Sequence, residues 1–126
     1  MKLGFSAALA ALTLGLTGCD ESMCSGMESA YEDYQAHVRD CGGTTQNLSP
    51  TRDTDVCNDH IDDVCTDDDE AVMFDYMDCL RDLPGCGAGV DAIKAAARQC
   101  SDTASRKINS NNADCHLTFA GFTVDD

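Results

Sequence analysis

Nine cysteines in 126 residues constrain the fold of this chain more than any other feature. Cys19 follows a short apolar leader, and the other eight lie between residues 24 and 115. The leader carries Lys2 ahead of an uncharged stretch, which is typical of an export signal, and thiols oxidise in the cell envelope. We expect four disulfides rather than a zinc site, because the chain has no C-x-x-C pair and its cysteine spacings do not fit a zinc knuckle.

The leader ends in a recognisable pattern. Its uncharged stretch, Leu3 to Leu16, is too short to cross the roughly 30 Å hydrocarbon core of a bilayer. The residues at the junction are Leu16, Thr17, Gly18 and Cys19, whereas an ordinary secretory signal ends in a small-x-small site. This order resembles the lipobox of bacterial lipoproteins, and the resemblance covers the first nineteen residues. It implies that the Cys19 thiol receives a diacylglyceryl group, that the leader is cut off, and that the new amino group can also be acylated.

Cysteine parity agrees with lipidation of Cys19. The alternative is an ordinary signal peptide whose Cys19 joins a disulfide, but nine cysteines cannot all pair, and setting Cys19 aside leaves an even eight. Two or three acyl chains, at about 0.8 kcal/mol per buried methylene, would hold a soluble domain on a bilayer. The lipid bilayer is therefore the expected partner of acylated Cys19. Asp20 resembles the signal that keeps enteric lipoproteins at the inner membrane. It therefore favours a location on the periplasmic face of the inner membrane, with the outer membrane as the alternative location.

Cleavage would leave 108 of the 126 residues, enough for one domain with a modest core. We divide the chain into a leader, 1–18, a lipidated cysteine with a short tether, 19–25, and a cysteine-rich acidic domain, 26–126. So short a tether would keep the domain close to the lipid surface. Loss of Lys2 changes the formal charge from −15 to −16. A chain this acidic gains no counterion-release energy from nucleic acid and is repelled by anionic lipid headgroups.

The spacing of apolar residues predicts an all-α fold, a small disulfide-stapled bundle of about four helices. The expected buried stripes are Met23, Met27, Ala30, Tyr31, Tyr34, Val38 and Cys41 in the first helix; Val56, Cys57, Ile61, Val64 and Cys65 in the second; Val72, Met73, Tyr76, Met77, Leu80 and Leu83 in the third; and Val90, Ile93, Ala97, Cys100, Ala104 and Ile108 in the fourth. We expect a polar turn over 109–114. The apolar residues from 117 to 124 are expected to form a short strand or an extended tail.

Local signals predict where these helices begin and end. The expected starts are a capping box of Ser25 with Glu28, the pair Ser49-Pro50, a capping box of Asp67 with Glu70, and Gly87 to Val90. The expected ends are Cys41-Gly42-Gly43, Cys65, Leu83-Pro84-Gly85, and Arg106 with Lys107.

An up-down-up-down bundle would sort the eight cysteines by height. Cys41, Cys57, Cys79 and Cys86 would fall at one end and Cys24, Cys65 and Cys100 at the other, where Cys115 on the tail would be free to return. Because a loop near residue 68 would fold the third helix back on the second, Cys57 is expected to face Cys79. We predict the pairs Cys57–Cys79, Cys41–Cys86, Cys24–Cys100 and Cys65–Cys115. Each bridge could contribute about 2 to 4 kcal/mol, so reduction is expected to unfold the domain.

Acidic residues concentrate in the middle of the chain. Twelve of the 23 lie between Asp53 and Asp82, against one base, Arg81. This segment is the candidate divalent-cation surface, because calcium is held by about six to eight converging oxygens. Asp53-Thr54-Asp55 begins like an EF-hand loop, but the fifth, sixth and twelfth positions hold Cys57, Asn58 and Val64, so that motif is rejected. The other interpretation is a solvated helical face, and we predict no metal ligands and no cofactor.

A second constellation surrounds His60. Cys41-Gly42, followed by Cys57-x-x-His60, resembles secreted phospholipase A2, in which a glycine-rich calcium loop precedes a helix bearing Cys-x-x-His and an Asp. The resemblance implies His60 as general base and the next residue as the carboxylate on calcium. That residue is Ile61, and the loop is reduced to Gly42-Gly43. The mechanism therefore lacks its metal ligand. His37 and His116 are isolated and are expected to be surface or packing residues.

The function that these features favour is non-enzymatic. We expect a membrane-anchored lipoprotein of the bacterial envelope with a structural or protein-binding role, and an envelope protein as a second partner beside the bilayer. An acidic divalent-cation-binding module is the alternative. The third hypothesis is a degenerate phospholipase A2-like enzyme around His60.

Overall fold

The computed structural model of the chain describes residues 22–46 and 53–124. The elements in order are α1 (Met23–Asp40), α2 (Thr54–Val64), α3 (Asp67–Arg81), the 3-10 turn η1 (Cys86–Ala88), α4 (Val90–Asn111), α5 (Ala113–Phe119) and the 3-10 turn η2 (Ala120–Phe122). Four disulfides connect them, and no strand occurs among the described residues. The predicted fold class, a small disulfide-stapled helical bundle, is confirmed.

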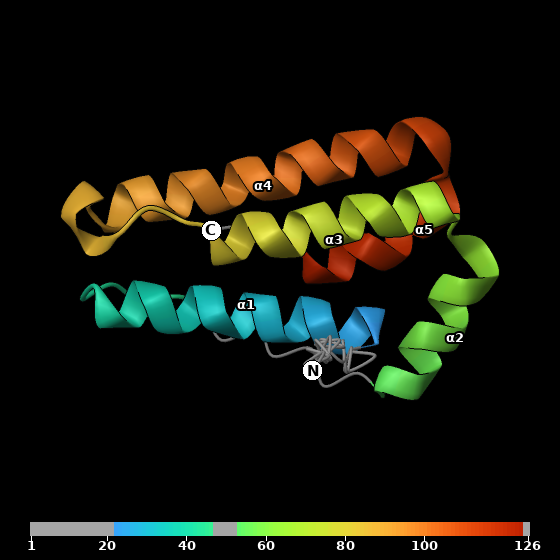
Figure 1. The fold of residues 1–126 in the computed structure, drawn as a ribbon, viewed down its shortest axis with the longest axis horizontal. Helices are drawn as coiled ribbons and strands as arrows, with labels where there is room; N and C mark the ends of the chain where they lie inside the picture. The colour runs from blue at the N-terminus through green and yellow to red at the C-terminus, as the bar shows by residue number, and fades with distance from the viewer. Residues whose placement is uncertain (1–21, 47–52, 125–126) are drawn as a thin grey trace, which may run out of the picture.

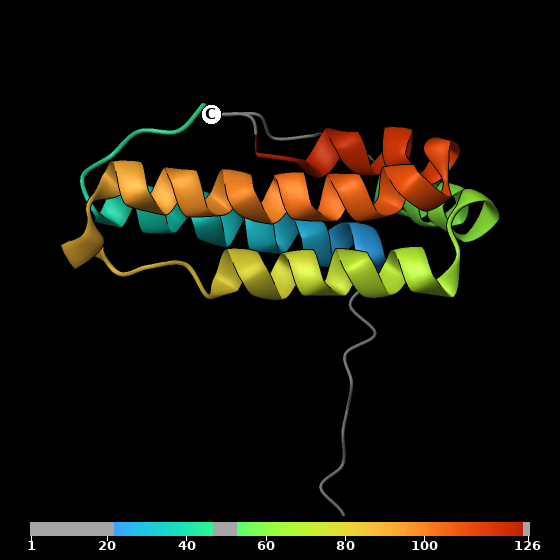
Figure 2. The same cartoon turned by 90° about the horizontal axis from the view of Figure 1, so that it is seen from above.

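Three long helices, α1, α3 and α4, lie side by side, with α3 packed against both of the others (Figure 1). Helix α2 instead lies across one end of these three, and α5 packs on α4 and α2 on the side away from α3 (Figure 2). We call the end that holds α2, α5 and the start of α1 the α2 end. The opposite end, with η1 and the end of α1, is the η1 end.

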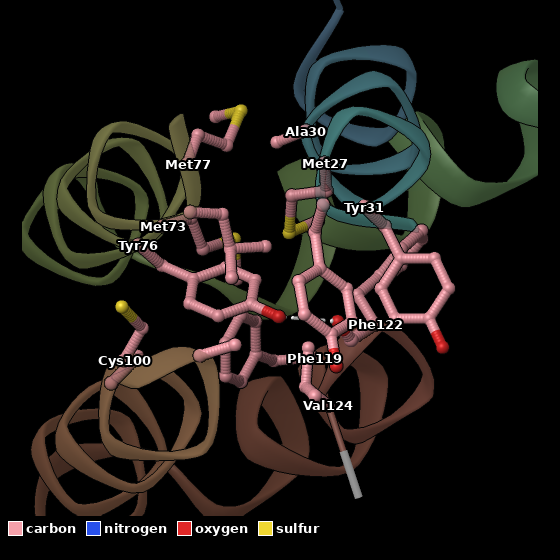
Figure 3. Close-up of a cluster of buried hydrophobic side chains, with 14 of the residues drawn as sticks. Met27, Ala30, Tyr31, Met73, Tyr76, Met77, Cys100, Phe119, Phe122 and Val124 are labelled. Carbon is pink, nitrogen blue, oxygen red and sulfur yellow. Dashed lines mark hydrogen bonds between the residues drawn. The ribbon is translucent and has the colours of Figure 1, made fainter. Parts of the chain in front are cut away.

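The core lies between the three long helices and the C-terminal segment (Figure 3). The predicted stripes of α1, α3 and α4 face it, and Tyr76 meets Phe119 edge to face with ring centroids 5.1 Å apart. Burial of each such side chain contributes about 1.5 to 3 kcal/mol. In α2 only Cys57 and Ile61 are buried, and Val56, expected inside, is 66% exposed.

The C-terminal segment corrects a prediction. Helix α4 continues past its expected end at Arg106 and Lys107 to Asn111, where a polar turn was expected over 109–114. Residues 113–119 form α5, which includes 117–119 of the stretch expected as a strand or extended tail. The reason is a cap hidden in the polar run: the Asn112 side chain accepts a hydrogen bond from the Cys115 N–H and starts α5. The segment after α5 is then fixed by buried hydrogen bonds, from the Tyr76 hydroxyl to the Phe122 carbonyl (2.7 Å) and from the Val124 N–H to Ser101 Oγ (2.8 Å).

Several helix starts differ from those predicted. Ser22, not Ser25, caps α1, and its side chain accepts from the Ser25 N–H. Asp53 caps α2, while the predicted start at Ser49-Pro50 lies outside the described residues. The capping box of α3 is Thr66 with Asp69, one residue earlier than Asp67 with Glu70. These shifts arise because several polar residues stand next to one another, and tertiary contacts select among them.

The ends of α1 and α3 follow the predicted signals. Gly42, at a φ of +84°, and Gly43 donate to the Arg39 and Val38 carbonyls and close α1 in a Schellman motif. A Cβ at Gly43 would lie 2.6 Å from a Val90 methyl, so only glycine fits there. Helix α3 ends at Arg81, just before Leu83-Pro84-Gly85. Helix α1 begins at Met23, within the stretch 19–25 that was assigned to the tether.

The disulfides are Cys24–Cys57, Cys41–Cys86, Cys65–Cys115 and Cys79–Cys100. Two predicted pairs, Cys41–Cys86 and Cys65–Cys115, are confirmed. The predicted pairs Cys57–Cys79 and Cys24–Cys100 are wrong, because α2 is not an upright member of the bundle. Its first turns lie beside the start of α1, which brings Cys57 to Cys24, and α3 packs on α4, which brings Cys79 to Cys100.

Candidate functional site

The α2 end is assembled by covalent and polar links. Cys57 is bridged to Cys24 with a Cα–Cα distance of 6.2 Å, and the Cys24 N–H donates to Asn58 Oδ1 at 3.1 Å. At the other end of α2, Cys65 is bridged to Cys115 of α5. The Asn112 amide donates to the Val64 carbonyl, so α2 and α5 are joined at their adjacent ends. The start of α1, α2 and α5 therefore form one linked unit.

A seam runs along the surface where α2 meets α5. We define the seam by the residues that line its two open hollows, of about 260 and 460 Å³, which share His60 and Thr118. The seam residues are Val56, Cys57, His60 and Val64 on α2, Leu117 and Thr118 on α5, and two carboxylates, the α2 cap residue Asp53 and Asp114 in the first turn of α5. The side chain of Leu117 is 72% exposed, like that of Val56 at 66%. The seam therefore presents apolar groups to the surroundings of the molecule.

His60 lies on this seam as an exposed side chain. The residue that would carry the calcium carboxylate in a phospholipase, Ile61, is 1% exposed and belongs to the core. Cys57 is bonded to α1 rather than to a calcium loop. The predicted cysteine and histidine do share one face of α2, and Asp53 and Asp114 line the same two hollows as His60. Among the described residues no three His, Cys, Asp or Glu side chains come together as a possible metal site, so the phospholipase hypothesis stays a prediction.

The acidic segment from Asp53 to Asp82 comprises helices α2 and α3. Most of its carboxylates are exposed and none of the described residues form a group of three or more His, Cys, Asp or Glu that could hold a metal ion. Asp69 is the buried exception, and it accepts from the Thr66 N–H (2.9 Å), the Thr66 hydroxyl (3.0 Å) and the Asn112 amide (3.3 Å). These bonds give Asp69 a structural role in capping α3.

A groove of about 290 Å³ between α3 and α4 was not anticipated from the sequence. Its lining includes Cys79 and Cys100, which are bonded to each other, and the small side chains of Ala96 and Ala104 on α4. Small residues recurring beside the buried stripe of α4 are the signal that could have indicated it, since they leave room between two packed helices.

The other two histidines, His37 and His116, are not among the seam residues. His37 Nε2, on α1, lies 2.7 Å from the carbonyl oxygen of Pro84. Because a carbonyl oxygen can only accept a hydrogen bond, the ring N–H is the donor. This bond ties the end of α1 to the segment after α3. Near it, Arg81 and Asp33 form an ion pair at 3.8 Å. His116 is half-buried on α5. Both histidines occupy surface or packing positions in the fold.

The lipobox residues 16–19, including Cys19, lie outside the described residues, as do Lys2 and Asp20. Lipidation of Cys19 therefore stays a prediction. No described helix is long and apolar enough to cross a membrane. Comparison with protein-family models, curated proteins and solved structures gives no match for the chain.

Proposed function

We propose that this chain is a lipid-anchored protein of the bacterial cell envelope. Acylated Cys19 holds it in the membrane, and the helical domain acts at the membrane surface in a structural or protein-binding role without catalysis. Asp20 favours the periplasmic face of the inner membrane, with the outer membrane as the alternative location.

The observation that carries this proposal is the closure of the disulfide framework. Cysteines 24, 41, 57, 65, 79, 86, 100 and 115 pair with one another in four bonds. None of these eight thiols is left for Cys19, which argues against the ordinary secretory signal whose cysteine joins a disulfide. The lipobox order of residues 16 to 19 supplies the chemistry that would use the remaining thiol.

A binding or structural role is supported by how the polar residues of the domain are used. The buried Asp69 caps α3, Ser101 holds the C-terminal segment, and His37 donates to a carbonyl. These groups are engaged in holding the fold, and the exposed carboxylates keep the surface soluble. A rigid, cross-linked domain of this kind is suited to presenting a fixed surface to an envelope protein.

Mass spectrometry of the intact chain from bacterial membranes tests the anchor. We expect the wild-type protein to begin at Cys19 and to carry the mass of a diacylglyceryl group. Cys19→Ser should abolish both the cleavage and the added mass, while Thr17→Ala, which keeps a small residue in the lipobox, should retain them. A mature chain with unmodified Cys19, or with Cys19 in a disulfide, would contradict the proposal.

Cross-linking of the lipidated protein in intact cells tests the binding role. We expect a defined adduct with an envelope protein that is lost when the domain is reduced before cross-linking, because the binding surface depends on the fold. A chain that yields only uncross-linked monomer at all cross-linker concentrations would argue against a protein partner.

A further inference from the structure

The tether between the lipidated cysteine and the domain is very short. Helix α1 begins at Met23 and is capped by Ser22, so four peptide units separate the Cα atoms of Cys19 and Met23. A fully extended chain spans at most about 3.6 Å per residue, which limits this separation to about 14 Å. The start of α1 must therefore lie within that distance of the acylated residue.

The disulfides carry this constraint from α1 to α2 and α5. Cys24, in the first turn of α1, is bonded to Cys57, whose Cα is 6.2 Å away. The end of α2 is bonded in turn to α5 through Cys65 and Cys115. Figures 1 and 2 show α2, α5 and the start of α1 at the same end of the molecule. The α2 end is thus the part of the domain that the anchor holds against the membrane.

The same end exposes apolar side chains. Among the described residues, three large hydrophobic side chains are exposed: Val56, Phe74 and Leu117. Val56 and Leu117 belong to the seam between α2 and α5, and Phe74 lies on the outer face of α3 at 52% exposed. Apolar area on a surface that already lies beside lipid gains free energy by entering the interface, since its removal from water is favourable.

Provided that Cys19 is acylated as proposed above, we propose that the seam between α2 and α5 rests on the lipid surface of the membrane that holds the anchor. Its apolar side chains, Val56 and Leu117, enter the headgroup boundary. The carboxylates that also line it, Asp53 and Asp114, and their neighbours on α2 are repelled by anionic headgroups, so the seam fits a lipid surface without net charge, such as phosphatidylcholine or phosphatidylethanolamine. The η1 end and the groove between α3 and α4 then stay accessible to a protein partner.

The absence of tryptophan from the sequence provides a direct test. Leu117→Trp places a single fluorophore on the seam, and Phe74→Trp places one at a similarly exposed position on α3. Both full-length variants are produced with their lipid and reconstituted in phosphatidylcholine vesicles whose acyl chains carry bromine, a quencher of tryptophan emission. We expect Leu117→Trp to shift to shorter wavelength and lose emission relative to unbrominated vesicles, and Phe74→Trp to do neither. Val56→Trp, on the other side of the seam, should behave like Leu117→Trp.

Vesicle flotation in the same samples separates this proposal from the anchor on which it depends. A chain that does not float with the vesicles shows that Cys19 provides no anchor. A chain that floats while both seam variants keep their emission overturns the lipid contact of the seam and leaves the anchor intact. Equal quenching of Phe74→Trp also overturns it, because the domain would then have no fixed face toward the membrane. Vesicles containing phosphatidylglycerol should reduce the quenching of Leu117→Trp, since the carboxylates of Asp53 and Asp114 would be repelled.

Discussion

Helices α2 and α3 are neighbours in the chain but are held in the fold by different means. Helix α3 buries Met73, Tyr76, Met77 and Leu80 between α1 and α4, and has one disulfide. Helix α2 buries only Cys57 and Ile61 along its 11 residues. Cys57 and the C-cap residue Cys65 bond it at both ends to other helices.

The cysteines contribute most to holding a helix in place where its apolar packing is smallest. Most of the stability of a protein helix comes from burying an apolar face, and α2 has too few apolar residues to do so. Its acidic residues are repelled by one another, which weakens it further. Two bridges fix α2 across the end of the bundle, and the long helices rely on their shared core.

Reduction of all four disulfides should have the largest effect. Each bridge contributes about 2 to 4 kcal/mol by restricting the unfolded chain, and the sum is comparable to the whole stability of a small domain. We expect the far-ultraviolet circular dichroism of the domain to lose its cooperative thermal transition in strong reductant. A melting temperature that is the same with and without reductant would show that the core suffices alone.

Ile93→Ala tests the packing of the long helices. Ile93 is fully buried on α4, and its truncation leaves a cavity that should cost about 2 to 5 kcal/mol. Val56→Ala, at an exposed site on α2, is the matched control and should change the free energy of unfolding by less than about 0.5 kcal/mol. Urea unfolding measures both. Equal losses for the two variants would mean that α2 is packed as tightly as α4.

Removal of one bridge should affect α2 locally. In the double variant Cys24→Ser with Cys57→Ser we expect a loss of about 2 to 4 kcal/mol and faster amide hydrogen exchange confined to α2 and the first turn of α1. The comparison is the double variant Cys79→Ser with Cys100→Ser. It removes a disulfide between α3 and α4, two helices that already pack on each other. There the amides of α3 and α4 should stay protected. If amide hydrogen exchange became faster throughout the domain in both variants, α2 would not depend on its disulfide more than α3 does.

Thr66→Ala should give the smallest of these effects. The Thr66 hydroxyl accepts from the Asp69 N–H at 3.3 Å and completes the capping box at the start of α3, so its loss should cost about 1 kcal/mol. Thr103→Ala, on the exposed side of α4 and outside any cap, is the control in the same thermal measurement. No difference between the two variants would show that the core holds α3 without its cap.

The long helices could be predicted from the sequence because each presents one continuous apolar stripe. The spacing from Met73 to Leu80, and from Ile93 to Ile108, is readable without the fold. The tilt of α2 could not be predicted, since two buried residues set no direction, and the pairing of Cys57 depends on that tilt. The closely spaced apolar residues Leu117, Phe119, Phe122 and Val124 were compatible with a short strand or tail, and the helix depends on the Asn112 cap. The seam requires the tertiary contact of α2 with α5.

The order of the disulfides has a consequence for how the protein matures. Among the eight described cysteines, none is bonded to its nearest neighbour along the chain: Cys24 skips Cys41, and Cys79 skips Cys86. A chain that emerges into an oxidising compartment from its N-terminus exposes Cys24 and Cys41 before Cys57. Oxidation in order of arrival then joins the wrong thiols, and the native bonds form only after thiol–disulfide exchange. If the chain is exported to the cell envelope as proposed, we therefore expect the yield of native protein to depend on isomerase activity as well as on oxidant.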